Sequence, residues 1–527
     1  MTMKNPELLD VPAPRIRIVR EGPPRSGAQY VLYWMIASRR LEDNFSLQQA
    51  AWWARELGLP LLTFEPLRSA YPWASDRLHA FVLQGMADNR AAAAAAGVTY
   101  YPYVEPEPGA GKGLLERLAQ DAAVVVTDDY PTFFLPRIVE AAATRLDCRV
   151  EAVDGNGLMP MRATTTVYPS AYAFRRYLQK SLPAQFAQFP LRHPLEALRG
   201  QAANVDPEVL ERWPAATDDI LSASPDALGA LPIDHTVAPS QVLTGGSRAA
   251  HAQLAHFLAH GLPTYHEQRS QPDSDAASGL SPWLHFGHIS AHHIFSEVAT
   301  GAGWTTRSLA AKAEGKSEGW WGAPPDVEAF LDELITWREV GFNFAANRPD
   351  YDQFESLPGW ARTSLEAHAS DHREHLYTLQ QFERAETADP VWNAAQRQLV
   401  REGRMHNYMR MLWGKKILQW TAHPREALSM MLELNNKYAL DGRDPNSYSG
   451  IFWVLGRYDR PWAPRREVFG VIRYMSSENT VKKLRLKEYL RQYGTEFPLQ
   501  NSATVLPGVK PPPGAGVARG AADGGSH

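Results

Sequence analysis

The segment YVLYWMIASRRLEDNFSLQQAAWWARELGLPLLTFE (residues 30–65) has a short apolar run at each end and a helix-like stretch between them. The runs 30–35 and 60–65 are brief and rich in aromatic and branched residues, which is typical of buried strands. The stretch 43–57 has Asp43 or Asn44 in place to cap a helix. This order predicts two parallel strands joined by a helix that packs on their sheet.

The same alternation continues to about residue 185. Apolar runs at 98–103, 122–126 and 149–154 predict three more strands, and 74–96 predicts a helix that ends at Gly97. Five strands alternating with helices predict an α/β, Rossmann-like domain with a five-stranded parallel sheet over residues 28–185.

The rest of the chain has a different pattern. Residues 186–245 are rich in Pro, Ala and Asp, and predict a connector with short helices. Strand signals nearly vanish over 246–496, where helical periodicity predicts an all-α domain. The two ends, 1–27 and the Pro/Gly-rich 497–527, are expected to be disordered tails.

Composition excludes several classes of protein. The chain has 527 residues, 44% hydrophobic and 21% charged, which is ordinary for a globular protein. No apolar run approaches the roughly 20 residues of a membrane-spanning helix, and the polar start does not resemble a secretory signal. The single cysteine, Cys148, excludes an internal disulfide and a cluster held by several cysteines. We therefore expect a protein of a reducing, bacterial-type cytoplasm, associated with the nucleoid, with no membrane contact.

Familiar catalytic motifs are missing. No glycine fingerprint for dinucleotides follows the first strand, and no phosphate-binding loop, HExxH spacing or serine nucleophile elbow occurs. The sequence therefore predicts no metal site, and it does not favour a hydrolase.

Charge and tryptophan are distributed unevenly. The formal net charge is −4, but residues 401–495 hold 18 Lys/Arg against nine Asp/Glu, and most of the 16 tryptophans lie in the C-terminal half. Packing in the core is one interpretation of the tryptophans. The other is nucleic-acid binding, in which cations contact phosphates and aromatic rings stack on bases.

Three tryptophans have a suggestive spacing. Trp413 and Trp420 are seven residues apart, which places them on one face of a predicted helix, and Trp392 lies on the preceding helical segment. They are either core residues or a chain of redox-active indoles that leads from a buried cofactor to the surface.

Two sets of charged residues have two interpretations each. Arg410 lies one turn before Trp413, and Asp441 is a candidate partner, so the two form either a surface ion pair or a buried pair that stabilises negative charge on a reduced flavin ring. Glu333 and Trp337 are four apart on one helix face. Glu333 is either a solvated charge or a protonated carboxyl that hydrogen-bonds a substrate carbonyl.

The segment SGLSPWLHFG (278–287) begins with small polar residues before an apolar stretch. Its amides and hydroxyls suit a diphosphate at a helix start, although an ordinary capped helix has the same pattern.

Several long motifs, in order, resemble the photolyase/cryptochrome superfamily, most closely the class II cyclobutane pyrimidine dimer photolyases. The resemblance covers most of residues 28–495. Besides 278–287, the motifs are YVLYWMIASRRLEDNFSL (30–47), YDQFESLPGWARTSLEAH (351–368), DPVWNA (389–394), MHNYMRMLWGKKILQW (405–420), LNNKYALDGRDPNSYSGIFW (434–453) and IRYM (472–475).

The resemblance implies one non-covalent FAD in the helical domain, active in its reduced form. Cofactor positions of the family match Tyr265, Ser278, Gly279, Leu280, Ser281, Arg410, Asn435 and Asp441, with Asn435 facing flavin N5. Electron-chain positions match Trp413, Trp392 and Trp420. The family also implies that the sheet domain holds an antenna chromophore, a deazaflavin or a folate.

The resemblance also implies a carbon–carbon lyase that binds UV-damaged DNA as a monomer, without an obligate protein partner. Positions of the pocket for the flipped lesion match Glu333, Trp337, Met411, Trp453 and Trp462. Positions that contact DNA or fill the gap left by the flipped bases match Arg269, Arg460 and Arg473. A photoreceptor that binds FAD without repairing DNA, and an enzyme that repairs (6-4) photoproducts, are the alternatives.

Overall fold

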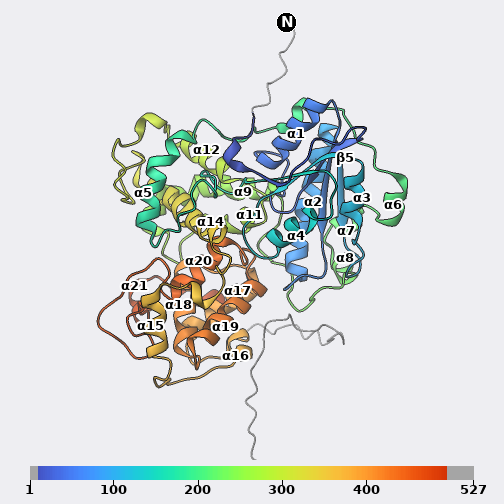
Figure 1. The fold of residues 1–527 in the computed structure, drawn as a ribbon. Helices are drawn as coiled ribbons and strands as arrows, with labels where there is room; N and C mark the ends of the chain where they lie inside the picture. Colours follow the sequence, from blue (N-terminus) through green and yellow to red (C-terminus); the bar gives the residue numbers. More distant parts are fainter. Residues whose placement is uncertain (1–9, 495–527) are drawn as a thin grey trace, which may run out of the picture.

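The computed structural model describes residues 10–494, in which a sheet domain is followed by a helical domain (Figure 1). The strands are β1 (Ile16–Arg20), β2 (Tyr30–Trp34), β3 (Leu61–Leu67), β4 (Thr99–Val104), β5 (Ala122–Asp128) and β6 (Arg149–Val153). Their order in the sheet is β1-β6-β5-β2-β3-β4, and all pairs are parallel except β1 with β6. The α/β fold class and its five parallel strands are confirmed.

The expectation that residues 1–27 form one disordered tail is wrong. Of these residues, 1–9 lie outside the described part of the chain, but Ile16–Arg20 form β1, an antiparallel edge strand that makes the sheet six-stranded. Arg17 on β1 forms an ion pair with Asp129 at 3.2 Å, and the nearby Arg15 is buried. The chain needs these distant partners to hold the strand IRIVR in place. The other predicted tail, 497–527, lies outside the described residues.

Side chains of the central strand β2 point alternately into two hydrophobic cores, one on each face of the sheet. Tyr30, Leu32 and Trp34 pack on the face covered by α3 (Leu114–Gln120) and α4 (Leu135–Ala143). Val31 and Tyr33 pack on the face covered by α1 (Phe45–Leu57). A strand with helices on both sides has no solvent face, which explains the continuous apolar run in its sequence.

The first two helices begin and end where their capping residues predict. The Asn44 side chain accepts hydrogen bonds from the amides of Ser46 and Leu47 at the start of α1. Helix α2 (Asp76–Ala96) ends at Gly97, whose φ of 68° is left-handed.

Residues 186–245 form short helices that pack against the sheet domain. They include η3 (Pro194–Leu198), α6 (Pro207–Arg212), α7 (Asp218–Leu221) and α8 (Pro225–Gly229). Helices α7 and α8 pack against α2, and α6 packs against α3.

The remaining residues are helical, and their C-terminal part forms the orange and red group in Figure 1. After α5 (Ala171–Ser181), the α-helices are α9 (Ser247–His256), α10 (Tyr265–Gln268), α11 (Ser281–His285), α12 (Ala291–Gly301), α13 (Pro325–Leu331), α14 (Arg338–Asn347), α15 (Gly359–Ala367), α16 (Leu379–Glu383), α17 (Pro390–Glu402), α18 (Asn407–Gln419), α19 (Pro424–Tyr438), α20 (Pro445–Val454), α21 (Ser477–Lys483) and α22 (Lys487–Tyr493). A π-helical turn, η7 (Asp332–Trp337), joins α13 to α14.

Buried polar contacts join the two domains. The Arg77 guanidinium on α2 donates to the carbonyls of Leu399 (3.3 Å), Val400 (2.6 Å) and Tyr438 (2.9 Å), near the ends of α17 and α19. Within the helical domain, Gly341 lets α14 approach α20, because a Cβ at this position would lie 2.7 Å from the carbonyl oxygen of Pro445.

No helix between residues 10 and 494 combines the length and the apolar character that crossing a membrane requires. The same residues contain no group of three or more His, Cys, Asp or Glu side chains placed to hold a metal ion.

Candidate functional site

A buried ion pair links three elements of the helical domain. Arg410 Nη2 on α18 lies 2.9 Å from Asp441 Oδ1, and the two side chains are only 13% and 11% exposed. The Ser281 hydroxyl, at the start of α11, donates to the other Asp441 oxygen at 2.8 Å. The structure thus brings together three residues that are 31 to 160 positions apart in the sequence.

Asn435 lies on α19, close to this ion pair in the chain, and is buried. Its amide nitrogen donates to Ser447 Oγ on α20 at 2.9 Å and to Asn436 Oδ1 at 3.2 Å. These bonds fix the orientation of an uncharged amide that can hydrogen-bond a flavin ring.

The segment 278–281 forms a turn rather than a long helix. Gln253 Nε2 donates to the Ser278 carbonyl at 2.8 Å, Gly279 has a left-handed φ of 63°, and Leu280 is buried. Helix α11 has only five residues, so its dipole contributes little. The hydroxyls and backbone amides of the segment are therefore the groups that a diphosphate would contact.

The donor set fits a flavin dinucleotide. A buried guanidinium balances negative charge on a reduced ring, and amide and hydroxyl groups suit its polar edge and a diphosphate. Two buried nitrogens elsewhere in the helical domain, Arg269 Nη1 and His406 Nδ1, have no hydrogen-bond partner among residues 10–494. Buried polar atoms without a partner call for an explanation, and a bound ligand is one.

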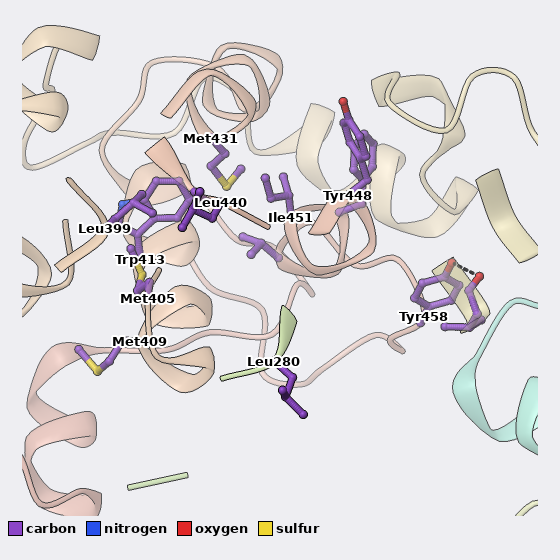
Figure 2. Packing of buried hydrophobic residues seen from close by; sticks show 14 of the residues in the cluster. Leu280, Leu399, Met405, Met409, Trp413, Met431, Leu440, Tyr448, Ile451 and Tyr458 are labelled. Carbon is purple, nitrogen blue, oxygen red and sulfur yellow. Dashed lines mark hydrogen bonds between the residues drawn. The ribbon is translucent and has the colours of Figure 1, made fainter. Parts of the chain in front are cut away.

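The three predicted electron-chain tryptophans form a connected, buried group. Trp392 Nε1 donates to the Trp413 carbonyl at 3.0 Å, and the rings of Trp392 and Trp420 are 6.1 Å apart. Their exposed fractions are 1% for Trp413, 0% for Trp392 and 4% for Trp420. Figure 2 shows Trp413 among the apolar side chains of the surrounding core cluster.

Trp420 lies at the very end of helix α18. The helix ends at Gln419, and Trp420 is its C-cap residue, whose amide still donates to the Lys416 carbonyl at 3.0 Å. The half-buried Tyr377 ring lies 5.5 Å from Trp420 and extends the aromatic contacts toward the surface.

Glu333 and Trp337 lie on the π-helical turn η7, where the sequence predicts an ordinary α-helix. π-Helical turns are rare in proteins, and those that occur are often found at functional sites. The Glu333 side chain is 36% exposed, yet burial raises its pKa to about 7. Both observations fit a carboxyl that is surrounded by protein atoms but still partly open to solvent.

Arg269 and Tyr265 lie beside Glu333. Arg269 Nη2 is 3.9 Å from Glu333 Oε1, and its guanidinium lies 5.5 Å from the centre of the Tyr265 ring. His406 Nε2 contacts the Arg269 carbonyl oxygen at 3.1 Å. Arg269 therefore lies next to Glu333, a catalytic candidate.

Basic and aromatic side chains alternate at the other predicted DNA positions. The Arg473 guanidinium lies between two rings, 5.5 Å from Trp453 and 4.9 Å from Trp462, and Arg460 lies 5.1 Å from Trp462. The Met411 methyl group lies against Gly450 on α20, one turn from Trp453. Among the described residues, no ring contact joins Trp337 to these tryptophans.

Sequence reasoning missed two side chains around these groups. Lys415 is fully buried 5.3 Å from the Trp453 ring, where burial lowers its pKa to about 7. Gln396 accepts the Trp413 indole N–H at 2.8 Å. Neither has a sequence signal, because both are ordinary residues for the exposed face of a helix.

A separate cavity of about 440 Å³ lies at the carboxyl ends of β2, β3, β4 and β5. It is lined by the aromatic side chains Trp34, Phe64, Tyr71, Tyr103, Tyr130, Phe133, Phe134, His285 and Phe286. The chain reverses its direction of strand addition between β2 and β5. Open α/β sheets bind ligands at this point.

Comparison with known proteins identifies the family. The deoxyribodipyrimidine photo-lyase of Methanothermobacter thermautotrophicus is 33% identical over 480 residues, which cover 91% of this chain and 97% of that protein. The photo-lyase of Arabidopsis thaliana is 33% identical over 90% of this chain and 92% of its own, and that of Oryza sativa subsp. japonica is 34% identical over 90% and 89%. This chain belongs to the photolyase/cryptochrome superfamily.

Solved structures of photolyases and cryptochromes share the fold. A class III photolyase from Agrobacterium tumefaciens matches with a TM-score of 0.64 at 20% identity, over 89% of this chain and 87% of that chain. A cryptochrome from Synechocystis sp. matches with a TM-score of 0.63 at 16% identity, over 88% of each chain. No protein-family model matches the sequence.

Proposed function

We propose that this chain is a light-dependent DNA repair lyase of the class II type, which splits a flipped-out cyclobutane pyrimidine dimer into two pyrimidines. The observation that carries the proposal is the partly exposed Glu333 carboxyl, which has a raised pKa and lies 3.9 Å from Arg269 on the π-helical turn η7. The relatives named deoxyribodipyrimidine photo-lyase, aligned over about nine-tenths of the chain, support it.

In this proposal residues of α18, α19 and the segment 278–281 would hold FAD. FAD supplies the chemistry when bound, because its excited, reduced form donates the single electron that opens the cyclobutane ring. Arg410 and Asp441 hold charge next to the ring, and Asn435 orients its amide toward it. Ser278, Ser281 and Tyr265 would offer hydroxyls to the diphosphate of FAD.

Glu333 acts on the lesion. A neutral carboxyl donates a hydrogen bond to a pyrimidine carbonyl and stabilises the negative charge that forms there during splitting. Burial disfavours the carboxylate, so the folded protein keeps the proton on Glu333 up to about neutral pH.

The lesion must leave the duplex to reach this carboxyl. Extrusion costs a few kcal/mol and costs least for a damaged base, which gives part of the selectivity. Trp337, Met411 and Trp453 offer apolar surfaces to the pyrimidines, and stacking contributes about 1–3 kcal/mol per base. Arg460 and Arg473, held against the Trp462 ring, are placed to contact phosphates or the gap in the duplex.

The connected tryptophans suit the reduction of oxidised FAD. We assign the order of electron transfer as Trp413, Trp392, Trp420, because Trp420 has the highest exposed fraction of the three. Tyr377, half-buried and in ring contact with Trp420, extends this route toward solvent.

The 440 Å³ cavity is the proposed antenna site. Its walls are aromatic, and two lining residues, Phe133 (φ 63°) and Arg443 (φ 68°), have the left-handed backbone that non-glycine residues adopt at a cost. Arg443 and His285 line the cavity, and Asp441 and Ser281, close to them in the chain, belong to the flavin site. A deazaflavin or a folate here would lie near FAD.

The decisive experiment compares two lesions. The purified, FAD-loaded and reduced chain is mixed with oligonucleotides that carry one cyclobutane dimer or one (6-4) photoproduct, and kept in blue light or darkness. Light-dependent loss of the dimer supports the proposal. Reversal of the (6-4) lesion alone favours the second enzyme, and FAD binding without any repair favours a photoreceptor.

A further inference from the structure

We propose that Arg175 is a positioning residue for Glu333: through a buried ion pair with Asp332, it holds the π-helical turn η7 that carries the Glu333 carboxyl. The inference rests on the proposed function, because it takes Glu333 as the group that acts on the lesion. It adds a residue of α5 that lies 157 positions before Asp332 in the sequence.

The ion pair between Arg175 and Asp332 is bidentate and largely buried. Arg175 Nε lies 2.6 Å from Asp332 Oδ1, Nη2 lies 2.7 Å from Oδ2, and each side chain is 11% exposed. Two parallel bonds from a planar guanidinium fix both the distance and the orientation of a carboxylate. Asp332 is the first residue of η7 and Glu333 is the second, so Arg175 fixes the point at which the turn begins.

The turn η7 depends on contacts beyond its own backbone. A π-helical turn is far less common than an α-helical one, which indicates that its own hydrogen bonds do not favour it. A shift of one residue in the hydrogen-bond register would rotate the Glu333 side chain by about 100° about the helix axis. Helix α5, at the left of Figure 1, packs against η7. The ion pair is therefore a contact through which α5 sets the direction of Glu333.

Arg175 is itself held by a second segment of the chain. Its Nη1 donates to the Gly315 carbonyl at 3.1 Å, so all three guanidinium nitrogens have a partner. Gln179, one turn further along α5, donates to the Lys316 carbonyl at 2.9 Å and accepts the Gly315 amide at 2.7 Å. A Cβ on Gly315 would lie 2.9 Å from the Tyr172 carbonyl oxygen, which shows that this loop packs closely on α5. These contacts fix one orientation of the Arg175 side chain.

The ion pair also sets the charge next to Glu333. Burial raises the pKa of Glu333, Arg269 and Arg175 lower it, and Asp332 raises it. Tyr265 is a further titratable group that faces this carboxyl. The charged residues of the neighbouring helices α13 and α14 have other partners: Asp326 contacts the His266 amide, Glu328 the amides of Gly319 and Ala323, Arg338 the Asn156 carbonyl, and Glu339 the amides of Leu158 and Met159. Loss of either member of the pair should therefore shift the pKa of Glu333, in opposite directions.

The first measurement follows the turn itself, by hydrogen exchange of the amides of residues 332–337 in the FAD-loaded chain. Arg175→Gln removes the guanidinium, and Asp332→Asn removes the carboxylate. Each leaves a buried charge without its partner, so exchange in this segment should become at least about tenfold faster. Gln179→Ala is the matched control, because it breaks bonds from α5 to the same loop but leaves the ion pair intact. Its exchange at 332–337 should equal that of the unaltered chain.

The second measurement is the repair yield per absorbed photon between pH 6 and pH 8, with reduced FAD and saturating dimer-containing DNA. At pH 6, where Glu333 is mostly neutral, both pair variants should lower the yield at least about fivefold, because the carboxyl is displaced. The yield falls as the pH rises through the pKa of Glu333. The midpoint of this fall should move to higher pH in Arg175→Gln, which leaves an unpaired negative charge, and to lower pH in Asp332→Asn, which leaves an unpaired positive charge.

Arg175→Lys keeps the test decisive if the other two variants do not fold. A lysine retains the positive charge beside Asp332 but cannot form two parallel bonds. The midpoint should therefore stay where it is in the unaltered chain, while exchange at 332–337 should still become faster.

Three results would overturn the inference. One is exchange and yield in Arg175→Gln and Arg175→Lys that match the unaltered chain. Another is an equal change in Gln179→Ala, which would assign the effect to the loop. The third is a midpoint that moves in the same direction in Arg175→Gln and Asp332→Asn. If the unaltered chain splits no dimer, the proposed function fails, and exchange at 332–337 alone then decides whether Arg175 holds the turn.

Discussion

Glu333 gives the repair reaction a predicted pH dependence. Burial raises its pKa to about 7, so the carboxyl is neutral in about nine-tenths of molecules at pH 6, half at pH 7 and one-tenth at pH 8. If only the neutral form donates a hydrogen bond to the lesion, the yield of dimer splitting should fall up to about ninefold from pH 6 to pH 8. The positive charge of Arg269 lowers the pKa of Glu333, and the negative charge of Asp332 raises it. Arg175 forms an ion pair with Asp332 at 2.6 Å and so offsets part of the effect of Asp332.

The assay is the repair yield per absorbed photon in single turnover, with chemically reduced FAD and saturating DNA. Glu333→Gln is the matched control, because its amide donates a hydrogen bond at every pH, so its yield should be flat. Two other buried groups, Glu339 and Lys415, also have a pKa near 7. A profile that falls equally in Glu333→Gln would assign the titration to such a group, and a flat profile in the unaltered chain would refute the reasoning.

Four further perturbations have expected outcomes. Asp441→Ala breaks a buried ion pair and should lower the free energy of unfolding of the apoprotein by about 3 kcal/mol, with loss of the flavin absorbance at 450 nm. The control Glu488→Ala, which breaks an exposed ion pair, should lower it by less than about 1 kcal/mol, and equal effects of the two variants would contradict the account. Trp392→Phe should stop photoreduction of oxidised FAD but spare repair by the reduced enzyme, and wild-type photoreduction would remove Trp392 from the chain. Arg473→Gln should weaken DNA binding and reduce the slope of log affinity against log salt by about 1, so an unchanged slope would exclude a phosphate contact. Gly341→Ala should cost about 1–3 kcal/mol in a denaturant titration because its Cβ would crowd α20, and a neutral effect would show that the two helices can separate.

The sheet domain was predictable because its signals are local. The runs at 30–35 and 60–65 are mainly apolar, and the caps at Asn44 and Gly97 mark the helix ends. Strand β1 was missed because apolar residues alternate with arginines in IRIVR, and the partners of Arg17, Asp129 and Glu140, lie more than 100 residues away. An edge strand of this kind depends on tertiary contacts that spacing does not reveal.

The candidate site was predictable only as separate residues. Spacing and resemblance indicated Arg410, Asp441 and the three tryptophans, but the ion pair depends on how α18 packs against the loop that carries Asp441. The π-helical turn at Glu333 has no signature in the sequence. The cavity could not be foreseen, since it is assembled from the ends of four strands together with His285 and Arg443 of the helical domain.

The central claim is that reduced FAD in the helical domain lies within electron-transfer distance of a dimer held at Glu333 and Trp337. The most direct measurement is the excited-state lifetime of reduced FAD in the purified chain, without DNA and with a saturating dimer-containing oligonucleotide. The account predicts a clearly shorter lifetime with the dimer and no change with the undamaged oligonucleotide. An unchanged lifetime in a complex that is fully bound to the dimer would contradict it.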